Sequence, residues 1–178
     1  MLFIALNIQC NAPYRILFGI KNPNKAVSKK QIGKAIRKYK LNDFEHLYAN
    51  DSIKSIFYTN HLSVNSVVVF DDNGNHIKLK NETYCSNDYT TLTEVYNDSS
   101  YVEIDSSIIW QKIAKFSKSL HTVTNDSINF SKSTHTIILT WARYAGILNK
   151  INSKLWSVNL KSHKGVKVYY LNIDNIKN

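Results

Sequence analysis

The sequence predicts an α+β protein, and three local patterns support this class. Residues 29–39 have the period of an amphipathic helix. Residues 64–80 contain two apolar runs around a polar turn with Asn73-Gly74, which is typical of a β-hairpin. Residues 106–171 contain two stretches with helical spacing and then two segments that partly alternate. A chain of 178 residues suffices for one ordinary domain or two small ones.

The N-terminal part predicts a small α/β unit that includes this hairpin. Residues 2–9 and 14–20 are short apolar runs separated by turn residues, and we expect strands there. Ser28 is suited to cap the helix over 29–39. A short second helix is expected to begin at Asn42 or Asp43 and to run through Tyr48.

The C-terminal part predicts helices followed by a second hairpin. Residues 81–100 are polar and read as a loop, and residues 101–105 as a strand. The remaining expected elements are a helix from Asp105 or Ser106 to about Leu120, a helix over 133–148, and strands over 155–160 and 166–171 joined by a basic turn. We therefore expect two parts, residues 1–100 and residues 101–178.

Charge is distributed unevenly along the chain. The formal net charge is +10, yet residues 1–40 contain nine Lys and Arg and no acid. Residues 41–105 contain three basic and eleven acidic residues, and residues 106–178 contain eleven basic and two acidic residues. Two basic ends favour a nucleic-acid partner, with DNA preferred, because lysine and arginine neutralise phosphates. The alternatives are that the acidic middle folds against the basic ends, or that the base composition of the gene inflates Lys.

Two short motifs carry a resemblance to a known family. The segment from Phe130 to Leu139 places a polar Ser-x-Ser-Thr after a hydrophobic residue, and Ala145-Gly146-Ile147-Leu148 follows. With the expected helices and closing hairpin, residues 106–173 resemble a winged helix-turn-helix domain. The resemblance implies that the helix over 133–148 enters the major groove and that the hairpin tip lies along the backbone or minor groove.

The nucleic-acid-binding residues follow from this resemblance and from the basic helix. The resemblance implies contacts by Lys132, Ser133, Thr134, Thr136, Arg143, Lys161, His163, Lys164 and Lys167. Arg143, the long basic side chain of the expected recognition helix, is the candidate for reading a guanine edge. The helix over 29–39 offers a second surface, with Lys29, Lys30, Lys34 and Arg37. Alternatively, these four cations form an ordinary solvated helix face.

The expected recognition helix departs from the family because it is apolar nearly all round. Such a helix is usually buried. The favoured function is nevertheless DNA binding without enzymatic activity, in a regulatory or replication-accessory role. A homodimer is one expected form of such a protein. A different class is a protein-interaction module that inhibits a nucleic-acid-handling enzyme, as small phage-type proteins do, because the acidic middle could compete for a nucleic-acid groove.

Enzymatic motifs are not apparent in the sequence. The six His and two Cys have no metal-binding spacing, so neither a metal nor a cofactor is expected. A metal-dependent nuclease built from Asp71, Asp72, Glu103 and Asp105 is a further alternative, although no Lys accompanies Glu103 and Asp105 in the sequence. The chain has no recognisable signal or membrane span, which favours the cytoplasm and a reduced Cys10 and Cys85.

Overall fold

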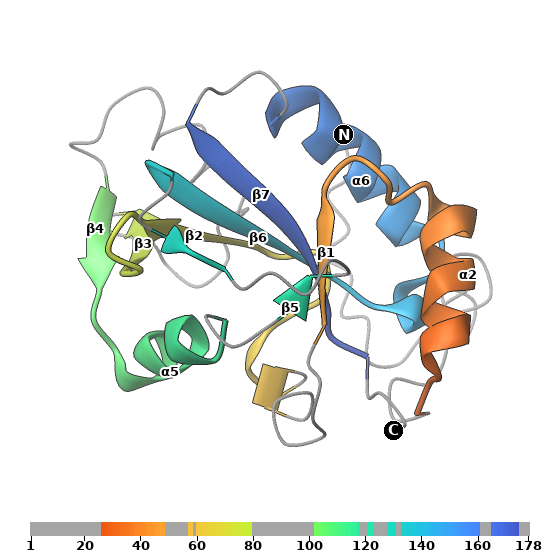
Figure 1. Ribbon diagram of the computed structural model, residues 1–178, viewed down its shortest axis with the longest axis horizontal. Coiled ribbons are helices and arrows are strands. Elements are labelled where there is room, and N and C mark those ends of the chain that lie inside the picture. Colours follow the sequence, from red (N-terminus) through yellow and green to blue (C-terminus); the bar gives the residue numbers. More distant parts are fainter. Residues whose placement is uncertain are drawn as a thin grey trace, which may run out of the picture.

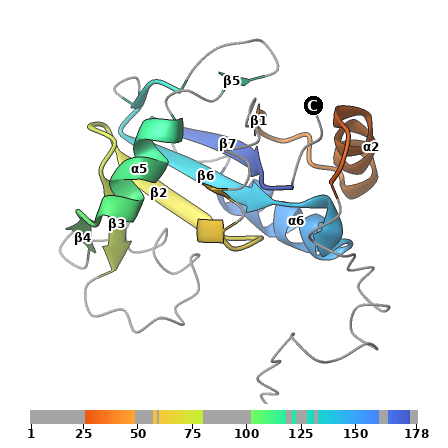
Figure 2. The same cartoon turned by 90° about the horizontal axis from the view of Figure 1, so that it is seen from below.

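A single mixed β-sheet with helices on both faces organises the protein (Figures 1 and 2). The structure is a computed structural model. It describes residues 26–48, 57–58, 60–79, 102–117, 121–122, 128–130, 133–160 and 165–174. None of the helices in these ranges has both the length and the apolar character needed to cross a membrane.

Seven strands form the sheet in the order β4-β3-β2-β6-β7-β1-β5. Their bounds are β1 Glu45–Tyr48, β2 Val67–Asp71, β3 His76–Leu79, β4 Val102–Asp105, β5 His121–Thr122, β6 His135–Trp141 and β7 Val166–Asn172. From β4 to β6 each neighbour is antiparallel, whereas β6, β7 and β1 run parallel to one another. The helical elements are α2 Lys29–Tyr39, α5 Ile108–Ser117, the short 3₁₀ helix η3 Arg143–Ala145 and α6 Leu148–Leu160.

Each face of the sheet has its own core. On one face, buried residues of α2 and α6 such as Ile32 and Trp156 pack with Ile137 and Leu139 of β6. On the other face, Ile113 of α5 belongs to a cluster with Ile138 and with other alternate residues of the strands. Successive residues of β6 therefore point into different cores, as strand geometry requires.

The predicted α+β class is confirmed, as are several of its elements. Helix α2 begins after Ser28, whose side chain and that of Gln31 form a capping box. The hairpin of β2 and β3, the strand β4 and the helix α5 also lie where we expected them. At the hairpin turn only Gly74 has a positive φ, +85°. The Asp71 carboxylate completes this turn, because it accepts the backbone N–H groups of Asn73 and Asn75 at 3.0 and 2.7 Å.

The helix predicted over 133–148 is wrong. Residues 135–141 form the strand β6, and the 3₁₀ helix η3 follows. A strand covered on both faces has no polar side, so its sequence is a continuous apolar run that periodicity cannot distinguish from a buried helix. The β-branched Thr136, Ile137 and Ile138 favour the extended backbone.

The strand predicted over 155–160 is also wrong, because these residues belong to α6. The apolar and polar residues of this segment partly alternate, which resembles a strand. Trp156 and Leu160 are also four residues apart, however, and both are buried on one face of the helix. Residues 166–171 do form a strand, but β7 pairs in parallel with β6 through the α6 crossover and not as a hairpin. The described residues thus lack the recognition helix and wing hairpin of the expected domain.

Two other expectations concern the N-terminal part. The short helix expected through Tyr48 is wrong, because residues 45–48 form the strand β1 beside β7. The strands expected over 2–9 and 14–20 and the loop over 81–100 lie outside the described residues. The expected boundary near residue 100 does not separate two sheets, since β2 and β6 from either side of it are paired neighbours.

The double-sided burial of β6 can be tested by truncation of consecutive residues. Ile138→Ala and Leu139→Ala are each expected to lower the free energy of unfolding by about 2–5 kcal/mol, because each opens a cavity in a different core. Urea denaturation measures both changes, with Ile109→Ala on the exposed face of α5 as the control. A cost below about 1 kcal/mol for either β6 variant contradicts the two-sided core.

Candidate functional site

A basic groove lies between α2 and α6, on the side of the molecule away from β4 (Figure 1). Its first part is a hollow of about 170 Å³, where Lys34 and Lys38 of α2 meet Arg143 of η3. Its second part, of about 390 Å³, has Lys40, Lys150 and Lys154 in its wall. Tyr39 lines both parts. We call this surface, with its six cationic side chains, the basic groove.

The side of the groove formed by α2 follows from the amphipathic pattern of that helix. Ile32, Ala35 and Tyr39 are buried against the sheet, so the five cations of α2 are left on the solvent side. Neither α2 nor α6 contains an acidic residue. Their cations therefore have no carboxylate within their own helix, where residues three or four apart would otherwise pair.

Arg143 is positioned by a buried carboxylate. Its backbone N–H donates to Asp174 at 2.6 Å, and Asn172 donates its side-chain amide to the same oxygen at 2.9 Å. Burial raises the pKa of Asp174, although hydrogen bonds from Arg143 and Asn172 and the charge of Arg143 oppose this shift. The half-buried guanidinium lines the groove, and its Nε has no hydrogen-bond partner in the described part of the chain.

The α6 side of the groove is tied to the sheet by polar contacts. The buried Asn149 donates to the carbonyl groups of Ala142 and Gly146 at 2.8 and 3.1 Å, which ties the first turn of α6 to the end of β6. The Tyr170 hydroxyl donates to Ser153 at 3.0 Å, and Ser153 donates to the Lys40 carbonyl at 3.3 Å. These contacts connect β7, α6 and α2 directly beneath the groove.

The charges that line the groove are strongly asymmetric. Among the described lining residues, Asp43 is the single acid, against six cations. Four of the six other described acids, Asp71, Asp72, Glu103 and Asp105, lie on or beside β2 and β4, toward the opposite edge of the sheet, whereas Glu45 lies in β1 and Asp174 contacts Arg143. Among the residues that the structure describes, the walls of the groove therefore carry a clear excess of positive charge.

The structure brings only part of the predicted binding set together. Lys29, Lys30, Lys34 and Arg37 are exposed on α2, and Arg143 lines the same hollow as Lys34. Lys132, Lys161, His163 and Lys164 lie outside the described residues. The other members, Ser133, Thr134, Thr136 and Lys167, lie at the opposite end of β6 and β7.

Those four residues have structural contacts of their own. The Ser133 and Thr136 hydroxyls are 3.1 Å apart, and Thr134 donates to the Gly165 carbonyl at 3.1 Å. Thr136 is buried, so it presents no surface to a ligand. Lys167 is exposed, with its Nζ 6.0 Å from the Tyr169 ring centroid. The length of β6, about 20 Å, separates this end from Arg143.

Sequence reasoning missed Lys38, Lys40, Lys150 and Lys154 as members of one site. Lys150 and Lys154 are four residues apart, a spacing that would have placed them on one face had α6 been recognised as a helix. Lys40 follows α2 in a left-handed conformation with φ of 56°. No local pattern indicates that these lysines meet those of α2, because the tertiary packing of α2 and α6 decides it.

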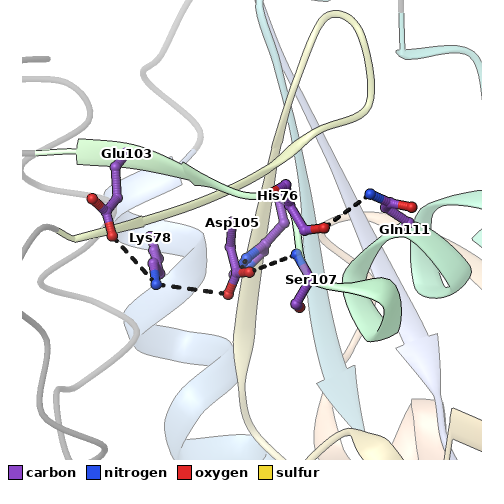
Figure 3. Close-up of polar contacts among 7 residues, drawn as sticks. His76, Lys78, Glu103, Asp105, Ser107 and Gln111 are labelled. Atoms are coloured by element: carbon purple, nitrogen blue, oxygen red, sulfur yellow. Dashed lines mark hydrogen bonds and ion pairs between the residues drawn. The ribbon is translucent and has the colours of Figure 1, made fainter.

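A second polar cluster joins β3, β4 and α5 (Figure 3). Lys78 lies 3.3 Å from a Glu103 oxygen and 4.0 Å from an Asp105 oxygen. Asp105 also accepts the Ser107 backbone N–H at 2.9 Å, before the first turn of α5. Partial burial acts to raise the pKa of Asp105, but the contacts with Ser107 and the charge of Lys78 hold that pKa below its usual value.

The four acids proposed for a nuclease do not converge. His76 pairs with Phe70 on one side and with Asp105 on the other, so these three side chains share the α5 face of the sheet. Asp71 follows Phe70 and therefore points to the opposite face, as does its partner His135. Within the described residues, no three His, Cys, Asp or Glu side chains are arranged to hold a metal ion. Lys78 does stand beside Glu103 and Asp105, but it is contributed by the neighbouring strand.

Comparison of the chain with protein-family models, with curated protein sequences and with solved structures found no significant match. The sheet and helices of the structure define a protein of the mixed α+β class, with a basic groove between α2 and α6.

The buried His76 is expected to make the stability depend on pH. Its ring stacks on Trp110 at 3.6 Å, and burial lowers its pKa from 6.5 to about 4. As the pH falls, His76 becomes protonated in the unfolded chain near pH 6.5, but in the folded protein only near pH 4. The free energy of unfolding should therefore decrease by about 3 kcal/mol as the pH is lowered from 6.5 to 4.

Urea midpoints measured across this pH range test the expectation. His76→Phe keeps an aromatic ring on Trp110 and should flatten the dependence, although not fully, because burial also lowers the pKa of His46. A His76→Phe profile as steep as that of the unaltered protein would show that His76 does not carry the effect.

Proposed function

We propose that this protein binds nucleic acid, with duplex DNA as the favoured form, through the basic groove and the adjoining face of α2. One observation carries the proposal. Cations from residues 29–40 and from residues 143–154, more than a hundred positions apart in the sequence, line one surface. Charge that only improves solubility is normally interleaved with acids and spread over the surface.

The length and the charge of α2 suit a phosphate backbone. Helix α2 is about 16 Å long and exposes five cations, and duplex DNA carries one negative charge per about 1.7 Å of its axis. Lysines act as point charges that follow the backbone, whereas the planar guanidinium of Arg143 can hold one phosphate with two hydrogen bonds. Contacts of this kind position a protein on a nucleic acid without reading its sequence.

This binding mode differs from the one that the resemblance implied. The segment expected to read bases is the buried strand β6, and Arg143 follows it in η3. Arg143 thereby changes role, from a candidate for a guanine edge to a phosphate ligand beside Lys34 and Lys38. The proposal concerns binding, and no reaction is assigned to the groove.

The salt dependence of binding tests the proposal. Anisotropy of labelled duplex DNA, single-stranded DNA and RNA should be measured between about 50 and 200 mM salt, where each phosphate contact contributes about −0.9 to the logarithmic slope on a duplex. We expect binding to duplex DNA with a steep slope. Absence of binding to all three nucleic acids, or affinity that does not change with salt, refutes the proposal.

A matched pair of variants locates the surface. Lys34→Gln with Lys38→Gln should weaken binding and reduce the salt slope by about 2, because two phosphate contacts are lost. Lys112→Gln with Lys115→Gln removes the same charge from the exposed surface of α5, on the other face of the sheet, and should change the slope much less. Equal losses in both variants would indicate an effect of net charge alone.

A further inference from the structure

Helix α6 carries an apolar ridge on the face that points away from the sheet. Ile147, Ile151, Leu155 and Val158 are 45%, 47%, 55% and 71% exposed. Ile151, Leu155 and Val158 are four and three residues apart in α6, and Ile147, which directly precedes the helix and accepts the Ile151 N–H, lies four residues before Ile151. The four side chains therefore fall on one side of the helix. We call these four side chains the α6 ridge.

The core of the protein does not account for the ridge. The residues of α6 that are described as buried are Asn149, Ser153, Trp156 and Leu160, which lie on the opposite side of the helix. Single exposed apolar residues are normal on protein surfaces, but a continuous apolar strip with a polar border marks an interaction site. On a helix, a strip of this spacing is the kind of surface that packs against another helix.

The border of the ridge is positively charged on one side. Lys150 and Lys154 are exposed and flank the ridge next to the basic groove, whereas the other flank contains the neutral Asn152. Helix α6 contains no acidic residue. A partner with acidic side chains beside its apolar strip would therefore find opposite charges along this flank.

A second copy of this chain fits the ridge less well. In an antiparallel pair of α6 helices related by a two-fold axis, the lysine flank of one helix lies beside the lysine flank of the other, so that like charges face each other. In a parallel pair the lysines would face the Asn152 flank, which offers no carboxylate.

We propose that the α6 ridge docks an acidic amphipathic helix from another protein. The ridge extends for about 17 Å, which corresponds to three turns of a partner helix. Apolar side chains three and four residues apart on that helix would pack against the ridge, and glutamates or aspartates beside them would pair with Lys150 and Lys154. The ridge adjoins the basic groove, whose wall includes Lys150, Lys154 and Val158, but docking of a helix on the ridge does not depend on nucleic-acid binding.

A pair of synthetic helical peptides tests the chemistry of the partner with the full chain. Both peptides have about 18 residues, with leucines spaced alternately three and four residues apart so that they lie on one face of the helix. One peptide carries glutamates beside the leucines, and the other carries lysines at the same positions. Fluorescence anisotropy should show that the glutamate peptide binds at least about tenfold more tightly than the lysine peptide. Equal binding of the two peptides, or no binding of the glutamate peptide, overturns the proposal.

Two matched variants test the place of docking. Ile151→Gln with Leu155→Gln leaves both lysines in place and should weaken binding of the glutamate peptide by about tenfold or more. Ile108→Gln with Ile109→Gln alters two exposed apolar residues of α5 and should leave this binding unchanged. All four positions are exposed, and circular dichroism with urea midpoints verifies that the variants fold.

Two further readouts separate the possible failures. The ridge variant should still bind duplex DNA, so that a failure of the ridge is distinguishable from a failure of the groove. If the ridge variant binds the glutamate peptide as well as the unaltered protein does, the ridge is not the docking site. A dimer of the unaltered protein in light scattering that the ridge variant abolishes would identify a second copy as the occupant and overturn the proposal.

Discussion

The central strand β6 has both faces in the core, so the chain must supply a cover on each side of the sheet. Ile137 and Leu139 face the layer of α2 and α6, and Ile138 faces the layer of α5. If one of the two helix layers were missing, the apolar side chains on that face of β6 would be exposed to water. The crossover from β6 through α6 to β7 meets this requirement on one face and also fixes where α6 lies.

The basic groove is a consequence of that cover. Because α2 and α6 share one face of the sheet, the polar sides of two helices without acidic residues become neighbours. The buried contacts of Ser153 and Asn149 hold α6 against the end of α2 and the end of β6. Positive charge is thus placed by the same packing that completes the core, which is why distant lysines gather without any shared motif.

Helix α6 carries two different surfaces beside each other. Its lysines line the groove, while its ridge of Ile147, Ile151, Leu155 and Val158 remains apolar and exposed. The polar cluster of Lys78, Glu103 and Asp105 contrasts with both, because opposite charges there pair with each other and connect β3 to β4. Opposite charges pair with one another at that edge of the sheet, whereas the described walls of the groove carry six cations and one acid, and the ridge is apolar and exposed.

Local chemistry in the sequence was sufficient for helix α2, for the hairpin of β2 and β3, and for the uneven charge. Each depends on neighbouring residues: a capping box at Ser28, a glycine turn at Gly74, and a count of charges. Only the tertiary structure decided that residues 135–141 are a strand and that Lys34, Arg143 and Lys150 line one groove. A segment buried on both faces has no periodic polar side to reveal its conformation, and contacts between residues a hundred positions apart depend on how the layers pack.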